Sequence, residues 1–379
     1  MRLVGGAWLR LVLMVLLAGS MQACNKEEGS KTSSGVAQSQ PPVTQTPSAS
    51  APQGKSLQAG LDGASPIPLA MRGATVLQTA EVKLDSALSK ESMGSLRQLG
   101  ANTVVLVPFM RQDSPRSDHV DVSGSVTDEQ LGAGIRAAHA LGMKVIVKPQ
   151  ILVGGGGWAG VVNPGSSQGW DRWFASYKRI LLHYAEMAEQ SQVELFVVGT
   201  ELKQSDKLPH WRGIIAAVRE VYKGNITYAA HNLDGIENYA HWELLDQVGV
   251  TLYPPLGSMA TRAAMQPVIQ RATAGLLAVH ERLGKPVLVT EVGIPSIHGA
   301  QSQPWDYSKK RCDAASAPEL QATVLDLWLE ALNQSWVSGV LVWNWYSDPY
   351  AGGRFDTDYT VQHKPAEAVL RRRWGGRPA

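Results

Sequence analysis

Two apolar segments that each end in a glutamate limit the possible folds of this chain more than any other feature. Residues 194–201 read ELFVVGTE, and residues 286–293 read PVLVTEVG. Near-continuous runs of branched and aromatic residues are typical of parallel strands that are covered on both faces. Because a buried, unpaired carboxylate costs several kcal/mol or more, we expect Glu201 and Glu291 to lie where these strands leave the core. The two segments therefore predict strands that bring two carboxylates to one edge of a sheet.

Alternating strand and helix patterns surround these segments from about residue 66 onward. The predicted strands cover residues 68–76, 102–108, 144–149, 194–201, 225–231, 248–253, 286–291 and 338–345. The predicted helices cover residues 89–99, 127–141, 170–187, 210–222, 236–245, 260–283, 318–333 and 365–373. Eight such units over roughly 310 residues predict a single (β/α)8 TIM barrel, at residues 66–379. A doubly wound open sheet is the alternative, but it normally has fewer units or a phosphate-binding turn after its first strand.

Residues 1–24 have the pattern of an export signal. Arg2 and Arg10 flank a short apolar run at residues 11–18, which is too short to span a bilayer. The following MQAC box is similar to the cleavage box of bacterial lipoproteins, in which a lipid is attached to the cysteine, here Cys24. A simple secretory signal with an incidental cysteine is the alternative. Both interpretations take the chain out of the cytoplasm.

Residues 25–65 differ in composition from both flanking regions. They are rich in Ser, Thr, Gln, Pro, Lys and Gly, and they contain almost no large apolar residues. Such a segment cannot bury enough surface to fold, so we expect a disordered linker. Together with a lipid on Cys24, this predicts a domain tethered to a membrane of the bacterial cell envelope, on the periplasmic or the cell-surface face.

Charge and cysteine content exclude several classes of partner. The formal net charge is +2, from 35 basic and 33 acidic residues, and the folded part has no basic block, so no nucleic-acid partner is expected. Outside the leader only Cys312 remains, which excludes an intramolecular disulfide and a cysteine metal cluster. The glycines at 154–157 are not followed by the Lys-Ser or Lys-Thr of a phosphate loop, and we interpret them as a flexible loop. No cofactor or metal is implied, and we expect a monomer.

In a (β/α)8 barrel, functional residues lie at the C-terminal ends of the strands. The candidates there are Lys148, Gln150, Thr200, Glu201, Asn232, Tyr253, Glu291, Trp343 and Trp345, and Trp158, after the glycine run, is a further candidate for substrate binding. Glu201 ends the fourth strand and Glu291 the seventh, so the two side chains can converge across the barrel mouth. Glycoside hydrolysis needs such a pair, because one carboxyl protonates the leaving oxygen while the other, ionised, attacks the anomeric carbon or activates water. Carboxyls about 5–5.5 Å apart give retention, and wider pairs give inversion.

Several of these candidates also have a purely structural interpretation. Tyr253 is placed to hydrogen-bond the carboxylate of Glu291, but it also suits the core. Of Trp343 and Trp345, we expect one to face the groove and the other to pack inward. His231, which ends the fifth strand, is more typical of a hydrogen-bonded structural histidine. Lys148 suits an ion pair that serves stability alone.

With glutamates ending strands four and seven, the domain resembles the clan A retaining glycosidases and, more closely, glycoside hydrolase family 113, best known for endo-β-1,4-mannanase activity. The similarity covers about residues 68–375 and rests on AHALG at 138–142, KP at 148–149, residues 170–177, VGTEL at 198–202, LYP at 252–254, TEVG at 290–293 and WNW at 343–345.

The resemblance implies that Glu201 is the general acid/base and Glu291 the nucleophile. It also implies that Tyr253 supports the nucleophile and that Lys148 and Trp343 shape the sugar site. The chain departs from the clan at Thr200, where Asn usually contacts the sugar 2-hydroxyl, and from the family at Gln150, which is often His.

The expected function is a retaining glycoside hydrolase that cleaves β-linked hexose glycans, mannan-type β-1,4 links first, by double displacement with two glutamates. Two alternatives remain open. One is a catalytically inactive carbohydrate-binding surface lipoprotein that kept the barrel. The other is a hydrolase or lyase that processes an exported bacterial polysaccharide.

Overall fold

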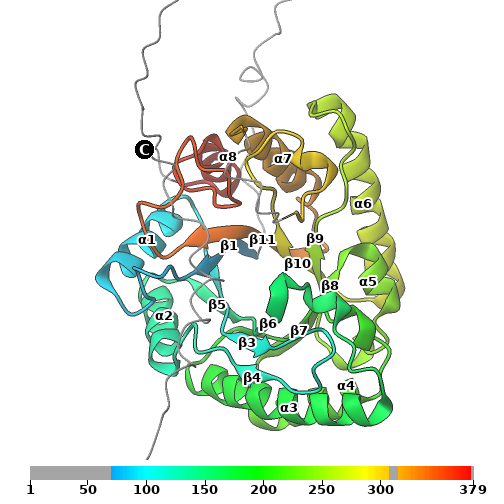
Figure 1. Ribbon diagram of the computed structural model, residues 1–379. Helices are drawn as coiled ribbons and strands as arrows, with labels where there is room; N and C mark the ends of the chain where they lie inside the picture. Colours follow the sequence, from blue (N-terminus) through cyan, green and yellow to red (C-terminus); the bar gives the residue numbers. More distant parts are fainter. Residues whose placement is uncertain (1–69, 307–314, 377–379) are drawn as a thin grey trace, which may run out of the picture.

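The computed structural model describes residues 70–306 and 315–376, which form a closed barrel of eight parallel strands surrounded by helices (Figure 1). In order around the barrel the strands are β1 (Met71–Leu77), β2 (Thr103–Leu106), β5 (Lys144–Val147), β7 (Leu195–Thr200), β8 (Asn225–His231), β9 (Val248–Leu252), β10 (Val287–Val292) and β11 (Val337–Tyr346). The last strand pairs with the first in parallel, which closes the barrel. The predicted (β/α)8 fold is confirmed.

Helices follow the barrel strands and cover their outer face (Figure 1). They are α1 (Ala87–Gln98), α2 (Asp128–Ala140), α3 (Ser167–Gln190), α4 (His210–Val221), α5 (Asn232–Asn238), α6 (Arg262–Leu283), α7 (Pro318–Ala331) and α8 (Pro365–Trp374). Helix α2 begins with a complete capping box between Thr127 and Gln130, which satisfies free backbone donors of its first turn. Over the ranges that the structure describes, no helix combines the length and apolar character needed to cross a membrane.

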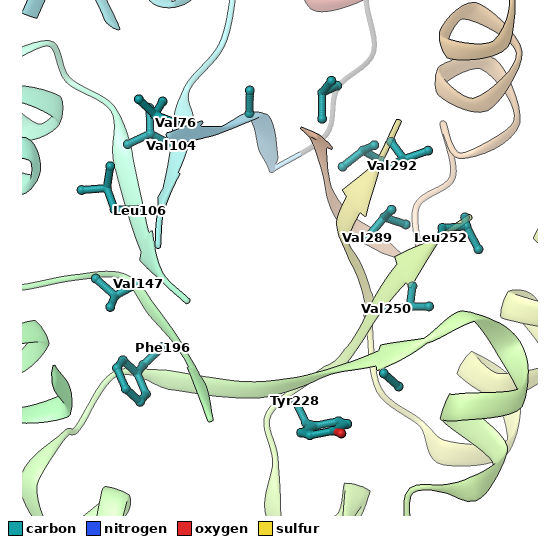
Figure 2. Packing of buried hydrophobic residues seen from close by; sticks show 14 of the residues in the cluster. Val76, Val104, Leu106, Val147, Phe196, Tyr228, Val250, Leu252, Val289 and Val292 are labelled. Carbon is teal, nitrogen blue, oxygen red and sulfur yellow. The ribbon is translucent and has the colours of Figure 1, made fainter. Parts of the chain in front are cut away.

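The core has two layers because successive side chains of a strand point to opposite faces. Inside the barrel, a small cluster includes Ile146, Leu195 and Val197. The neighbouring Val147 and Phe196 belong to the larger cluster between barrel and helices, and Figure 2 shows both pointing outward from their strands. This alternation explains why the strands read as continuous apolar runs.

The structure corrects three details of the sequence prediction. A second sheet, β4 (Asp121–Val122), β3 (Phe109–Gln112) and β6 (Gln150–Val153), is built from the segments that follow β2 and β5. The helix predicted at 236–245 instead begins at Asn232 and ends at Asn238. The backbone of Tyr239 is extended, and its ring stacks on Tyr228 with 4.1 Å between centroids. The loop at 154–157 contains a short 3-10 turn, Gly154–Gly156.

The leader at residues 1–24, its Cys24, the linker at 25–65 and Cys312 lie outside the described residues.

Candidate active site

Both glutamates are carried by strands of the barrel, beside irregularities in the strand ladder. The register of β7 against β8 shifts between Val197 and Thr200, directly before Glu201. The register of β10 against β9 shifts between Val289 and Glu291. Such irregularities re-aim side chains and are common next to active sites. Glu201 also has a positive φ of 55°, which is unusual for a residue with a side chain.

The backbone around Glu201 is held from β8. Its amide donates to the carbonyl of Ala229 (2.9 Å), and the next amide, of Leu202, donates to the hydroxyl of Tyr228 (2.8 Å). The Tyr228 hydroxyl in turn donates to Asp206 (2.7 Å), which is 2% exposed. These contacts fix the strained turn that presents the Glu201 carboxylate.

Three donors face the carboxylate of Glu291. The ammonium of Lys148 forms an ion pair with Oε1, and the amide of Gln150 donates to the same oxygen at 3.1 Å. The hydroxyl of Tyr253 donates to Oε2 at 3.0 Å. Burial raises the pKa of Glu291, and the Glu201 charge adds to this, while the Lys148 ammonium and these hydrogen bonds oppose it. The carboxylate form thus has its hydrogen-bonding partners already in place, as a nucleophile requires.

A different set of donors faces Glu201. Its Oε1 accepts from His231 Nδ1 (2.9 Å) and from the hydroxyl of Thr251. Its Oε2 accepts from the indole Nε1 of Trp158 at 2.5 Å. Burial raises the pKa of Glu201, but the hydrogen bond and charge of His231, with the bonds from Thr251 and Trp158, outweigh it and hold the pKa below its ordinary value.

His231 is oriented by Asn232. The Oδ1 of Asn232 accepts from the backbone amide of Tyr253 (2.8 Å), so its Nδ2 faces the Nε2 of His231 (3.0 Å). The neutral ring therefore fits with its proton on Nδ1, directed at Glu201. Burial lowers the pKa of His231, but its hydrogen bond to the Glu201 carboxylate and the charge of that group raise it above the ordinary value. Because both ends of the Asn232 amide are bonded within the site, the structure gives it a positioning role for His231, and its contact with a sugar stays a prediction.

The two tryptophans of β11 lie on different sides of the barrel wall. Trp343 clusters with Tyr253 and Tyr359, and its ring centroid lies 5.0 Å from the Lys148 ammonium. Trp345 is 2% exposed, and its indole donates to the hydroxyl of Ser92 in α1 (2.7 Å). This agrees with the expectation that one of the two tryptophans faces the groove and the other packs inward. The substrate contact suggested for Trp345 does not fit its indole, which packs and bonds in the layer between barrel and helices.

Thr200 and Gln150 each retain a buried polar atom without a partner. Among the described residues, none lies within hydrogen-bonding distance of Thr200 Oγ1 or Gln150 Oε1. An unsatisfied buried polar group costs about 1–3 kcal/mol, so such atoms are candidates for bonding a ligand. In residues 70–306 and 315–376, no group of three or more His, Cys, Asp or Glu side chains is arranged to hold a metal ion.

Sequence reasoning missed two donors to Glu201. Thr251 was not considered, although it precedes Tyr253 by two residues and the two side chains therefore share a face of the chain. His231 was treated as a structural histidine, and the structure shows it bonded to the acid/base candidate. Its place at the end of the fifth strand was the available signal.

Comparison with known proteins identifies the family to which this chain belongs. The family model described as Glycoside Hydrolase Family 113 matches residues 77–364. A solved structure of a GH113 β-1,4-mannanase complex has a TM-score of 0.71 and 30% identity, over 82% of this chain and 100% of that chain. The GH113 β-mannanase AaManA from Alicyclobacillus acidocaldarius, in complex with ManMIm, has a TM-score of 0.71 and 27% identity, over 80% of this chain and 97% of that chain.

More distant matches agree on the fold. A β-glucuronidase of Ruminococcus gnavus has a TM-score of 0.53 at 14% identity, over 81% of this chain and 50% of that chain, which indicates a shared barrel only. A search of curated proteins found no match. Since the family model spans well over half of the sequence and the two glutamates occupy the expected strand ends, the chain belongs to glycoside hydrolase family 113.

Proposed function

We propose that this protein hydrolyses β-1,4-linked mannan-type glycans with retention of configuration, with Glu291 as the nucleophile and Glu201 as the general acid/base. The observation that carries the assignment is the contrast between the two donor sets. Glu291 faces an ammonium, an amide and a phenol, and its side chain is 6% exposed. Glu201 is 15% exposed and keeps its Oε2 towards a loop rather than the barrel wall.

The proposed reaction is a double displacement. A Glu291 oxygen attacks the anomeric carbon, the bond from that carbon to the glycosidic oxygen breaks, and Glu201 gives its proton to the departing oxygen. In the second step Glu201 takes a proton from water, the water oxygen bonds to the anomeric carbon, and the ester to Glu291 breaks. Two inversions restore the β configuration.

Glu201 must carry a proton when the first step begins. In the free protein the donors around it favour the carboxylate. A bound glycan that covers the site shields the carboxyl of Glu201 from water, and this loss of solvation raises its pKa. Substrate binding thus prepares the acid.

A direct test measures the configuration of the first product and the role of Glu291. The purified chain is given an aryl β-mannoside and a panel of β-glycans, and proton NMR follows the anomer that forms first. Glu291→Ala is assayed with and without azide, beside Glu281→Ala, an exposed glutamate of α6, as a control. We expect the β anomer from the wild type, and an α-mannosyl azide only from the Glu291 variant.

Other outcomes point to the alternatives. A well-folded chain that binds β-glycans and cleaves none would favour a carbohydrate-binding protein. A product with an unsaturated, ultraviolet-absorbing sugar end would indicate a lyase. The pair of differently bonded glutamates argues against both, because neither a pure binder nor a lyase needs a nucleophilic carboxylate beside an acid/base.

We also propose that the protein is exported and held in the bacterial cell envelope as a monomer by a lipid on Cys24. The support is the sequence of residues 1–24 and the composition of the linker. Metabolic labelling with an alkynyl fatty acid would detect the lipid, and Cys24→Ser is expected to abolish the label. Light scattering of the purified chain would give the oligomeric state.

A further inference from the structure

Trp158 lies against the acid/base carboxylate, although it comes from a loop outside the barrel. It follows the Gly154–Gly156 turn and precedes a second short turn, Ala159–Val161. Its indole Nε1 donates to Glu201 Oε2 at 2.5 Å, and its ring centroid lies 4.8 Å from that of His231. The residue is nevertheless 39% exposed, which is a large fraction for a tryptophan.

The position of the indole is set by a close approach to Gly160. A Cβ on Gly160 would lie 2.4 Å from two carbons of the six-membered ring of Trp158, so the bare glycine backbone lies directly against the indole. Gly160 does not have a positive φ, so its backbone conformation alone does not require glycine. Glycine is needed at this position because a side chain would collide with the indole of Trp158, which Gly160 and His231 together hold in place.

The two oxygens of Glu201 have different surroundings. Oε1 accepts from His231 and Thr251, both carried by barrel strands. Among the residues that the structure describes, only Trp158 donates to Oε2, so Oε2 is the oxygen that can exchange a proton with a ligand. A departing glycosidic oxygen must come within hydrogen-bonding distance of Oε2, which places the sugar attached to it beside the exposed indole.

We propose that Trp158 forms the leaving-group subsite, in which its indole packs against the C–H face of the pyranose on the reducing-end side of the scissile bond. This inference rests on the proposed function. An aromatic ring with a free face and a polar edge suits a sugar, because the ring covers apolar C–H groups while the edge bonds an oxygen. Trp343, beside Lys148, lies on the side of the nucleophile, so the two indoles flank the bond that is cleaved.

The retaining mechanism uses this subsite twice. After the first sugar leaves, a second sugar can enter and accept the glycosyl group in place of water. The acceptor oxygen bonds to the anomeric carbon, the ester to Glu291 breaks, and the hydroxyl proton passes to Glu201. The ratio of transfer to hydrolysis therefore measures how well the subsite holds a sugar, independently of how fast the glycosyl-enzyme forms.

The test uses dinitrophenyl β-mannoside as donor and increasing mannobiose as acceptor, with transfer and hydrolysis products separated by chromatography. Trp158→Ala is expected to lower the ratio of transfer to hydrolysis by about tenfold, the size of one aromatic contact. Trp158→Phe keeps a ring and should retain most of the transfer. Gly160→Ala displaces the indole and should resemble Trp158→Ala. Trp336→Phe, before β11 at the opposite end of the barrel, is the matched control and should leave the ratio unchanged.

A binding measurement separates this inference from the proposed function. Calorimetric titration of mannobiose into Glu291→Gln and into the double variant Glu291→Gln with Trp158→Ala needs no turnover. If the wild type cleaves no mannoside while binding still depends on Trp158, the proposed function is wrong and the subsite remains. If the wild type is active and Trp158→Ala changes neither the transfer ratio nor the affinity, the subsite is overturned.

Discussion

Lys148 places its ammonium directly against the carboxylate of Glu291, and neither side chain is open to solvent, with exposed fractions of 0% and 6%. A buried ion pair normally gives little net stability, because the desolvation of both charges offsets their attraction. Here the ammonium opposes the rise in the pKa of Glu291 that burial causes, so it favours the ionised form that a nucleophile needs. The lysine thus contributes to reactivity more than to folding.

Replacing Lys148 by Met should shift the pH dependence of activity. Without the ammonium, burial raises the pKa of Glu291 further. The nucleophile acts above this pKa, so the acidic limb of the kcat/KM profile should move to higher pH. Rates with an aryl β-mannoside across the pH range would show this. Lys364→Met removes another buried lysine, paired with Asp356, and should lower Tm without moving the limb. Identical pH profiles of kcat/KM for the wild type and Lys148→Met would refute the role of Lys148 in lowering the pKa of Glu291.

Replacing His231 by Phe should shift the alkaline limb of the kcat/KM profile. Loss of the His231 hydrogen bond and charge raises the pKa of Glu201. A general acid works below its pKa, so the alkaline limb of kcat/KM should move to higher pH. The profile is measured with an oligosaccharide, whose poor leaving group needs protonation. His183→Gln, at an exposed pair with Asp128, is the control. A limb that stays in place, or moves down, would contradict the proposed link.

Asp206→Asn should stabilise the protein near neutral pH. Burial raises the pKa of Asp206 from 3.8 to about 6. Its contribution to stability is therefore present below 3.8 and lost as pH rises through about 6. The asparagine amide of the variant does not ionise, and it keeps an oxygen that accepts from Tyr228. The free energy of unfolding should therefore rise by at most about 3 kcal/mol at about pH 7.5, and by little at about pH 4. Urea denaturation at both pH values checks this, with exposed Asp85→Asn as control. An equal gain at both values would count against it.

Asp326→Ala should destabilise the fold and leave the chemistry intact. The carboxylate is 2% exposed and accepts from Arg373 Nε (2.7 Å) and Arg262 Nη1 (2.6 Å), which joins α6, α7 and α8. Removing it leaves two partly buried cations without this partner, at a cost of about 3–5 kcal/mol. Glu330 meets the same arginines but is 48% exposed, so Glu330→Ala should cost about 1 kcal/mol or less. Equal losses in urea denaturation would show that burial does not decide the difference.

The parts of the site carried by barrel strands could be predicted because strand order fixes where each strand end lies. Glu201, Glu291, Tyr253 and Lys148 followed from apolar runs and their count, without knowledge of any loop. Contacts between loops could not be found in this way. Phe109–Gln112 and Gln150–Val153, which follow Pro108 and Pro149, pair with each other outside the barrel.

Residues that depend on local geometry were harder to assign. Trp343 and Trp345 share one face in an ideal strand, yet the structure places one beside Lys148 and the other against Ser92. Trp158 was predicted to bind substrate, but its bond to Glu201 depends on the path of a glycine-rich turn that no periodicity encodes. Sequence patterns thus predicted which residues gather at the barrel mouth, but not which of them bond one another, whether they lie on strands, as His231 and Thr251 do, or in a loop, as Trp158 does.

Because Trp158 comes from a loop, the binding of the leaving sugar can change in evolution without a change in the nucleophile and its partners. The partners of Glu291 come from barrel strands or from residues that directly follow them, so changes there disturb the core. Residues 154–161 lie outside the barrel and tolerate changes of length and sequence more readily. An exchange of this segment is therefore expected to change the balance between hydrolysis and glycosyl transfer, while the nucleophile and the linkage that it cleaves stay the same.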